Sequence, residues 1–145
     1  MGDQVAAGFE PHFRKSKFTD PWEPLYSRVE ADQVKIGTIL QEAHCNSRGL
    51  VHGAFLAAIA DNAVGLSCGV AMKNQGREPG GLVTVNLSVD FVGQAKVGDW
   101  IETDIDVIKA GKSLCFANCI ISTVRGPVAR ANATFSIAQR HAPSK

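Results

Sequence analysis

A single carboxylate interrupts a long apolar stretch of this chain. Asp61 is the one charged residue between positions 53 and 72, in GAFLAAIADNAVGLSCGVAM. Burying an ionised carboxylate without partners costs several kcal/mol, so a sequence rarely places one in such a stretch without a task or a partner. Two interpretations stay open. Asp61 lies on an exposed stripe or holds a neighbouring loop, or it is a desolvated carboxylate that acts as a base or nucleophile.

A glycine stands where the apolar stretch begins. Gly53 precedes Asp61 by eight positions. At the start of a helix, free backbone N–H groups meet the positive end of the helix dipole. Glycine lets another molecule approach such an N–H closely, which suits a polarised carbonyl or an oxyanion. The alternative is an ordinary helix start, with glycine selected for packing.

The spacing of these two residues has a geometric consequence. On one helix, Gly53 and Asp61 would stand about 12 Å apart along the axis and about 80° apart around it. One small carbonyl cannot easily contact both. If both act on one reacting centre, each must come from a different subunit, as in a two-fold dimer with antiparallel helices side by side. The sequence therefore predicts an inactive monomer.

The elements around these residues follow from hydrophobic periodicity. Residues 53–70 are apolar on nearly all sides, which predicts a buried helix. Alternation over 83–91 predicts a strand whose apolar face is formed by Val83, Val85, Leu87, Val89 and Phe91. One or two strands are expected within 27–42, and further strands over 101–108, 113–124 and 128–139, with a turn at 109–112. This order favours an α+β fold in which a curled antiparallel sheet wraps the helix.

Composition narrows the class of protein. The 145 residues are 45% hydrophobic, which predicts one domain, with residues 1–24 as an N-terminal arm of unassigned function. The net charge of +1 comes without charged blocks, so we expect neither nucleic-acid nor membrane binding. No signal-like or membrane-length apolar segment is evident, which favours a cytoplasmic protein. The four cysteines lack metal-ligand spacing, so we expect reduced thiols and no metal site.

The run Asn46-x-x-Gly49-x-x-His52-Gly53, with Asp61 eight positions further on, resembles the hotdog-fold acyl-CoA thioesterases of the phenylacetate-pathway (PaaI-like) branch. Downstream, GGLVTVNLSVDFVGQAKVGD and VIKAGKSLCFANCII are similar to the later strands and the G-K turn of that family. The resemblance spans about residues 25–140. It implies a hotdog fold, an acyl-CoA substrate and a homodimer that is required for the active site, often paired into a homotetramer. It implies no cofactor, since coenzyme A is part of the substrate.

The resemblance also implies roles for individual residues. Asp61 matches the acidic catalytic residue, acting as general base or nucleophile, and Gly53 matches the glycine whose N–H polarises the thioester carbonyl. Asn46 would orient the carbonyl or the attacking water. Thr84 stands where relatives carry a hydroxyl that assists at the carboxylate. His52 is expected to order the loop, with a direct catalytic role as the alternative.

Coenzyme A binding is expected at the G-K turn. In similar proteins the phosphates lie near this turn, where lysines and free turn amides can bind them. The residues here are Lys109, Gly111, Lys112 and Ser113, with Arg48 or Arg77 as a possible addition. The alternative is an ordinary solvated hairpin tip.

The sequence departs from the family at Ala54, where many relatives have a second glycine. An added methyl group there would affect the substrate range more than the chemistry.

Three other functions compete with thioester hydrolysis. A non-catalytic protein of the same fold would bind acyl-CoA or another small ligand and leave it intact. A hydratase is disfavoured because no D-x-N-P-x-H-like run is present. A hydrolase based on Cys45 would need an activating environment that the sequence does not show. The acyl group stays open, although Phe55, Leu56 and Phe91 could line an aryl or medium-chain pocket or belong to the core.

Overall fold

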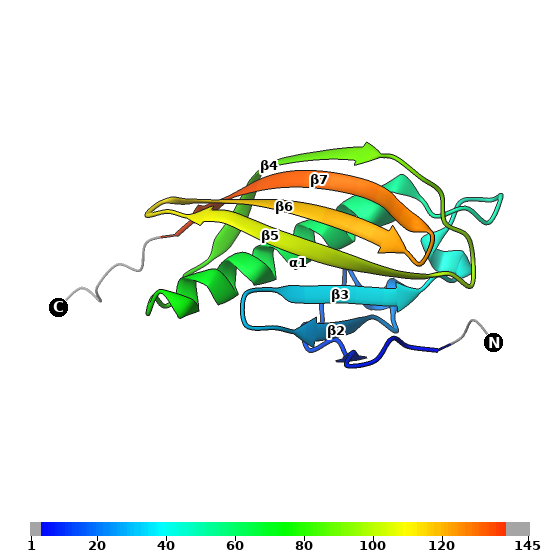
Figure 1. The fold of residues 1–145 in the computed structure, drawn as a ribbon, viewed down its shortest axis with the longest axis horizontal. Helices are drawn as coiled ribbons and strands as arrows, with labels where there is room; N and C mark the ends of the chain where they lie inside the picture. The colour runs from blue at the N-terminus through cyan, green and yellow to red at the C-terminus, as the bar shows by residue number, and fades with distance from the viewer. Residues whose placement is uncertain (1–3, 139–145) are drawn as a thin grey trace.

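The computed structural model describes residues 4–138 and shows one long helix packed on a seven-stranded antiparallel sheet (Figure 1). The strand order across the sheet is β1-β2-β3-β5-β6-β7-β4. The predicted wrapping of one helix by a curved antiparallel sheet is confirmed, and the region 27–42, where one or two strands were expected, contains most of β2 and all of β3. The elements are α1 (Gly53–Asn74), β1 (Glu10–Pro11), β2 (Tyr26–Val29), β3 (Val34–Ile39), β4 (Leu82–Phe91), β5 (Trp100–Ala110), β6 (Leu114–Thr123), β7 (Gly126–Ile137) and the 3₁₀ turns η1 (Asp20–Trp22) and η2 (Glu42–His44).

The helix α1 forms the core against the concave face of the sheet. Its sheet-facing side chains include Leu56, Ile59 and Val64, each at most 2% exposed. With 22 residues and a mean hydropathy of 1.6, α1 is long and apolar enough for a membrane span, but half of that apolar window is buried inside the domain. Burial of this kind suits the core helix of a layered domain.

The strand β4 forms one edge of the sheet and carries a bulge. Among the described strands it pairs with β7 alone, and the register shifts between Thr84 and Asn86. One extra residue in a strand reverses which side chains face the core. The predicted apolar face is therefore wrong in its first half, since Val83 and Val85 are 62% and 55% exposed. Thr84 instead turns inward toward α1.

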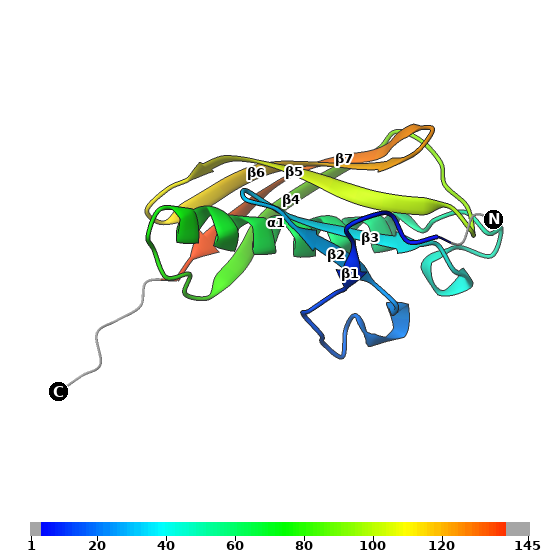
Figure 2. The same ribbon diagram turned by 60° about the horizontal axis from the view of Figure 1, so that its bottom comes forward.

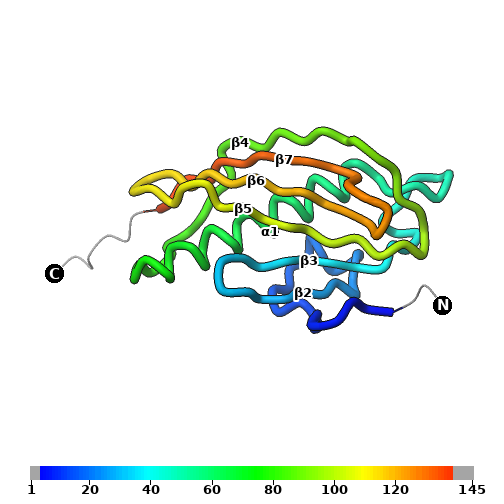
Figure 3. Tube along the Cα trace, in the orientation of Figure 1, coloured from blue at the N-terminus to red at the C-terminus, as the bar shows by residue number. Residues whose placement is uncertain are grey.

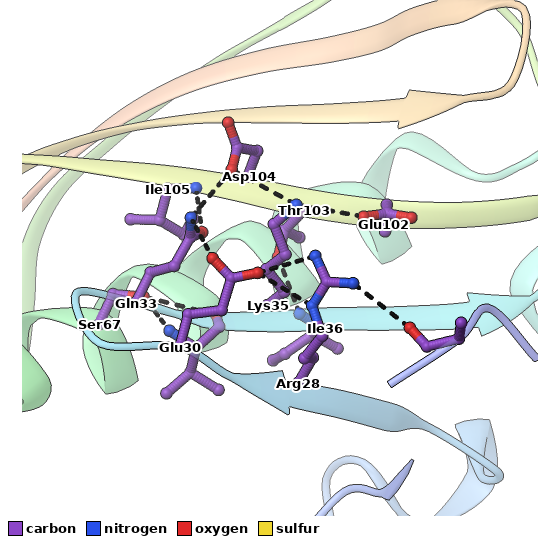
Figure 4. Close-up of polar contacts among 12 residues, drawn as sticks. Arg28, Glu30, Gln33, Lys35, Ile36, Ser67, Glu102, Thr103, Asp104 and Ile105 are labelled. Atoms are coloured by element: carbon purple, nitrogen blue, oxygen red, sulfur yellow. Dashed lines mark hydrogen bonds and ion pairs between the residues drawn. The ribbon is translucent and has the colours of Figure 1, made fainter. Parts of the chain in front are cut away.

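Buried polar side chains join the hairpin β2–β3 to the rest of the fold where strand pairing stops. The β3–β5 ladder covers three residue pairs. Beyond it, the Val34 N–H donates to Ser67 Oγ of α1 at 3.0 Å, and the Ile105 N–H donates to Gln33 Oε1 at 2.8 Å (Figure 4). Buried backbone donors need such partners. These bonds hold the hairpin against the second half of α1.

The N-terminal arm adds β1 to the sheet beside β2 and then packs on α1 through Trp22. It forms a lobe that projects away from the sheet (Figure 2). Trp22 meets Phe55 of α1 edge-on, with ring centroids 5.2 Å apart, and His44 stacks on the same phenylalanine at 4.3 Å. The Gln41 N–H donates to His44 Nδ1, so Nε2 carries the proton and donates to the Trp22 carbonyl at 2.8 Å. Burial lowers the pKa of His44.

The two ends of α1 face different parts of the fold. The loop over 45–52 lies at the N-terminal end of α1, and the β5–β6 turn lies near its C-terminal end (Figure 3). The described chain begins and ends at opposite ends of the molecule (Figure 3). Residues that act at the two ends of the helix are therefore kept apart within one chain.

Candidate active site

The carboxylate of Asp61 is held by a hydroxyl on the edge strand. Thr84 Oγ1 donates to Asp61 Oδ1 at 2.5 Å. The bulge in β4 makes this contact possible, because it turns Thr84 toward the helix. Asp61 Oδ2 accepts no hydrogen bond from the residues that the structure describes. The threonine thus fixes the orientation of the carboxylate and leaves one oxygen for chemistry.

Asp61 and Thr84 open onto a groove along the second half of α1. This groove, the acid-side groove, has a volume of about 640 Å³. Its walls come from the arm, the β2–β3 hairpin, α1, the start of β4 and the end of β7. They include Phe13, Arg14, Val29, Gly65, Leu66, Gly69, Val70, Lys73, Leu82 and Phe135. The half-buried carboxylate therefore lies in a trough that is lined by apolar side chains and by the cations Arg14 and Lys73.

Gly53 is the first residue of α1, and its N–H is unused within the described chain. The ring of Phe91 covers its Cα, so that a Cβ built at this position would lie 3.0 Å from Phe91 Cζ. A side chain here would have to displace the ring. The glycine therefore allows a close approach at a helix N-terminus with a free donor.

Asn46 adds a second donor beside Gly53. Its Oδ1 accepts from the N–H groups of Arg48 at 2.9 Å and Leu50 at 3.2 Å. These bonds fix which end of the amide is oxygen and leave Nδ2 without a partner among the described residues. Asn46 and Gly53 line one groove of about 480 Å³, the donor-side groove. Two free N–H groups in one groove can stabilise a developing oxyanion.

His52 caps the helix. Its Nδ1 accepts from the Ala54 N–H at 3.1 Å, and its ring is exposed to solvent. While it caps, Nδ1 cannot serve as a base, so this contact fits the loop-ordering role. Ala54 is also exposed, and its methyl lines neither groove of a single chain.

Four of the residues expected at the reacting centre fall into two pairs. Asp61 and Thr84 line the acid-side groove, whereas Asn46 and Gly53 line the donor-side groove. Because α1 runs unbroken from Gly53 past Asp61, the two lie about 12 Å apart along its axis. One chain does not bring the pairs to a common point. Each groove therefore holds one of the two pairs.

The G-K turn differs from its prediction. Lys109 lies within β5, which extends to Ala110, because the strand continues past the predicted turn. Gly111 donates its N–H to the Leu114 carbonyl at 2.8 Å, so this amide closes the hairpin and is not free for a phosphate. Ser113 is exposed beside them. Of the predicted turn residues, the side chains of lysine and serine can reach an anion, and the glycine amide cannot.

The structure separates the two arginines considered for coenzyme A. Arg77 donates to the carbonyls of Ala110 at 3.4 Å and Lys112 at 3.3 Å, so it lies against the turn. Arg48 instead lines the donor-side groove with Gly53. One arginine therefore lies at the β5–β6 turn and the other lies in the donor-side groove.

The structure bears on two alternatives that the sequence left open. Phe55 and Leu56 are 2% exposed and belong to the core, because their side of α1 faces inward, while Phe91 is exposed over Gly53. Burial raises the pKa of the Cys45 thiol, which disfavours the thiolate that a cysteine nucleophile needs. No cluster of three or more potential metal ligands occurs among residues 4–138.

Sequence reasoning missed two contributors to the site. His44 joins Trp22 of the arm to Phe55, and its carbonyl accepts the His52 N–H at 2.9 Å. The arm reaches the acid-side groove through Phe13. Neither residue lies in a recognisable motif, and the proline-rich arm composition gives no signal of where it packs.

Comparison with known proteins identifies the family. The thioesterase superfamily matches residues 48–129. A Pseudomonas aeruginosa protein that is an esterase by name is 37% identical over 134 residues, covering 92% of this chain and 97% of that protein. Mouse acyl-coenzyme A thioesterase 13 is 30% identical over 79 residues, covering 54% of this chain and 53% of the mouse protein.

Solved structures agree on the fold. The phenylacetic acid degradation protein PaaI of Thermus thermophilus, solved as a mutant, superposes with a TM-score of 0.72 at 17% identity, covering 85% of this chain and all of that one (100%). A Streptococcus mutans protein bound to acetyl-CoA gives 0.73 at 18% identity, covering 90% and 98% of the two chains. The chain is a member of the thioesterase superfamily and has the hotdog fold of these structures.

Proposed function

We propose that this protein hydrolyses acyl-CoA thioesters to a free acid and coenzyme A. Membership of the thioesterase superfamily supports thioester hydrolysis, and the named activity of the mouse relative supports the acyl-CoA class. The observation that carries the proposal is the Asp61 carboxylate, oriented by Thr84 with Oδ2 open to a groove. A free Gly53 N–H supplies the complementary group.

The reaction uses these groups in one of two ways. The thioester oxygen accepts hydrogen bonds from the Gly53 N–H and from Asn46 Nδ2. Asp61 either takes a proton from water, whose hydroxide adds to the carbonyl carbon, or adds to that carbon itself. The oxyanion then collapses, the C–S bond breaks and the coenzyme A sulfur leaves with its electron pair and takes up a proton. In the nucleophile route, water later hydrolyses the acyl-aspartate.

The reacting centre is proposed to form between two subunits. The strand β4 offers a ten-residue edge with no partner among the described strands, and Thr84 lies on it. Unpaired edges of this length invite pairing with another chain. Two-fold pairing of β4 with β4 of a second copy would place the two α1 helices side by side and antiparallel. Asp61 of one subunit would then face Gly53 of the other, and the tetramer stays an expectation from the resemblance.

Coenzyme A is proposed to bind near the β5–β6 turn. Lys109, Lys112 and Ser113 have exposed side chains there, and Arg77 lies against the turn. These cations and the hydroxyl suit phosphate oxygens. The acetyl-CoA bound to the S. mutans structure of the same fold supports a coenzyme A ester as ligand.

Release of free thiol from a panel of aryl- and fatty-acyl-CoA esters tests the activity. We expect turnover on at least one class, with a preferred acyl group visible in kcat/KM. Binding of these esters without any thiol release would contradict the proposal and would favour a non-catalytic acyl-CoA-binding protein. Hydrolysis in ¹⁸O-labelled water under single-turnover conditions separates the two routes, because label enters Asp61 only if it is the nucleophile.

A further inference from the structure

The arm is a fixed part of the fold. It pairs with β2 through Glu10 and Pro11, and the His12 N–H donates to the Leu25 carbonyl at 2.9 Å. The His12 ring is 4% exposed, and Trp22 packs on α1. These contacts hold the segment between them against the helix, so a side chain here has a defined position.

Phe13 of the arm opens into the same groove as the catalytic carboxylate. Its ring is 54% exposed, and it lines the acid-side groove together with Val29 of β2 and Asp61 of α1. A large apolar side chain that is exposed inside a groove is a candidate contact for an apolar ligand. The Phe13 ring packs against the ring of the buried His12, with centroids 5.0 Å apart, and this contact restricts the position of Phe13.

The helix leaves room on the far part of the floor of this groove, whereas the Phe135 ring covers Gly65, where a Cβ would lie 3.0 Å from Phe135 Cε2. Gly65 and Gly69 follow Asp61 at intervals of four residues, so all three lie on one face of α1. A Cβ at Gly69 would find only Leu82 Cδ1, at 4.0 Å, so this part of the floor has room. From Asp61 to Gly69 the groove extends about 12 Å along the helix, with Leu66 and Val70 among its apolar lining residues. The cations Arg14 and Lys73 also line it.

We propose that the N-terminal arm forms a wall of the acyl pocket and that Phe13 sets the preference for acyl groups of medium length or with an aryl end. This inference rests on the proposed function, which places the thioester carbonyl at Asp61. An acyl chain directed along α1 from that point passes Leu66 and reaches the arm, where it would cover Phe13. Short acyl groups such as acetyl end before the arm and would not contact it.

The chain offers a matched control for this residue. Phe18 belongs to the same arm and is 66% exposed, but it packs edge-on against Trp22 with centroids 5.0 Å apart and does not line the acid-side groove. Replacing Phe18 tests loss of an exposed aromatic from the arm without change to the groove.

The test measures binding of non-hydrolysable thioether analogues of acyl-CoA, from acetyl to dodecyl and including phenylacetyl, by isothermal titration calorimetry. In the native protein we expect affinity to rise with acyl length. Phe13→Ala should weaken medium-chain and phenylacetyl analogues by roughly 10-fold or more relative to the acetyl analogue, because lost apolar contact acts on the acyl end alone. Phe13→Leu should give a smaller loss, and Phe18→Ala should keep the native profile.

Two outcomes would overturn the inference: acyl affinity that does not depend on chain length in the native protein, or equal profiles for Phe13→Ala and Phe18→Ala. Thiol release by the same proteins separates this result from the proposed function. If binding depends on chain length and on Phe13 but no thiol is released, the thioesterase proposal is contradicted and the role of Phe13 in the acyl pocket stands. If thiol is released with a chain-length profile that Phe13 does not affect, the thioesterase proposal stands and the role of Phe13 is contradicted.

Discussion

The two halves of the candidate site are built in opposite ways. The donor half, Asn46 and Gly53, comes from one short loop and the helix start that follows it, and its groups are held by local hydrogen bonds. The acid half joins Asp61 to Thr84, 23 positions away, through a bulge in an edge strand. The first half offers free hydrogen-bond donors and the second a free carboxylate oxygen. Under the proposed function neither half hydrolyses a thioester alone, so the reacting centre would form at a junction between two subunits.

The largest effect should come from removing the charge of the acid half. Asp61→Asn keeps the shape of the side chain but removes the base or nucleophile, so kcat should fall by roughly 10³-fold or more. Thiol release under saturating substrate measures this, with the dimer verified by light scattering. Asp106→Asn, at an exposed position on β5, is the matched control and should keep native activity. Equal rates in all three proteins would make Asp61 structural.

Removing the donor of the other half should cost nearly as much. Gly53→Pro deletes the N–H at the first helical position, where proline is well tolerated, and the extended backbone of His52 (φ −77, ψ 131) suits a following proline. Gly53→Ala keeps the N–H and meets the same Phe91 ring. We expect kcat for the proline variant to lie roughly 10²-fold below that of the alanine variant. Similar rates in the two would show that the N–H carries no transition-state charge.

The hydroxyl that orients the carboxylate should matter less than the carboxylate itself. Thr84→Val removes the hydrogen bond to Asp61 with little change in shape. A bond to a charged group contributes about 1.5 to 3 kcal/mol, so kcat should fall by roughly 10- to 100-fold. Thr84→Ser should restore most of the rate. Steady-state kinetics on one ester compares the three proteins, and a valine variant as active as the serine variant would contradict the orienting role.

The smallest effect concerns the change of folding stability with pH, through the buried side chains of His44 and His12. Burial lowers the pKa values of His44 and His12 below their ordinary value of 6.5, so both are neutral in the fold. As the pH falls below about 6.5, the unfolded chain binds protons that the folded chain does not, and stability falls. Urea unfolding at pH 7.5 and 5.5 should show this loss, reduced in His44→Gln with His12→Gln. A free energy of unfolding that is constant or higher at pH 5.5 would contradict it.

Sequence predicted the donor half better than the acid half because local structure determines it. The first N–H groups of any α-helix have no partner within the helix, so a helix that begins at Gly53 leaves its N–H without an intrahelical acceptor. The separation of Gly53 from Asp61 followed from helix geometry alone. Thr84 was expected near Asp61 from the resemblance, whereas simple alternation in β4 placed it on the opposite face. A bulge has no clear signature in one sequence, so the side that Thr84 faces could not be derived.

The position of Phe13 and the end of β5 could not be derived from the sequence for a different reason. Phe13 reaches its groove through tertiary packing of Trp22 and His12, which no periodicity encodes. Lys109 was placed in a turn from the glycine two residues later and from the resemblance to a G-K turn, but β5 continues through it to Ala110. Local propensity predicts where strands end within a few residues, and the packing of neighbouring elements decides the rest.

Complementation between two inactive variants tests the central claim most directly. Co-expression of Asp61→Asn with Gly53→Pro chains should form mixed dimers in which one of the two sites combines a native Asp61 with a native Gly53. With random pairing half of the dimers are mixed, so roughly one quarter of native activity should return. If each site were formed within one chain, the mixture would be no more active than the mean of the two variants, and that result would contradict a site shared between subunits.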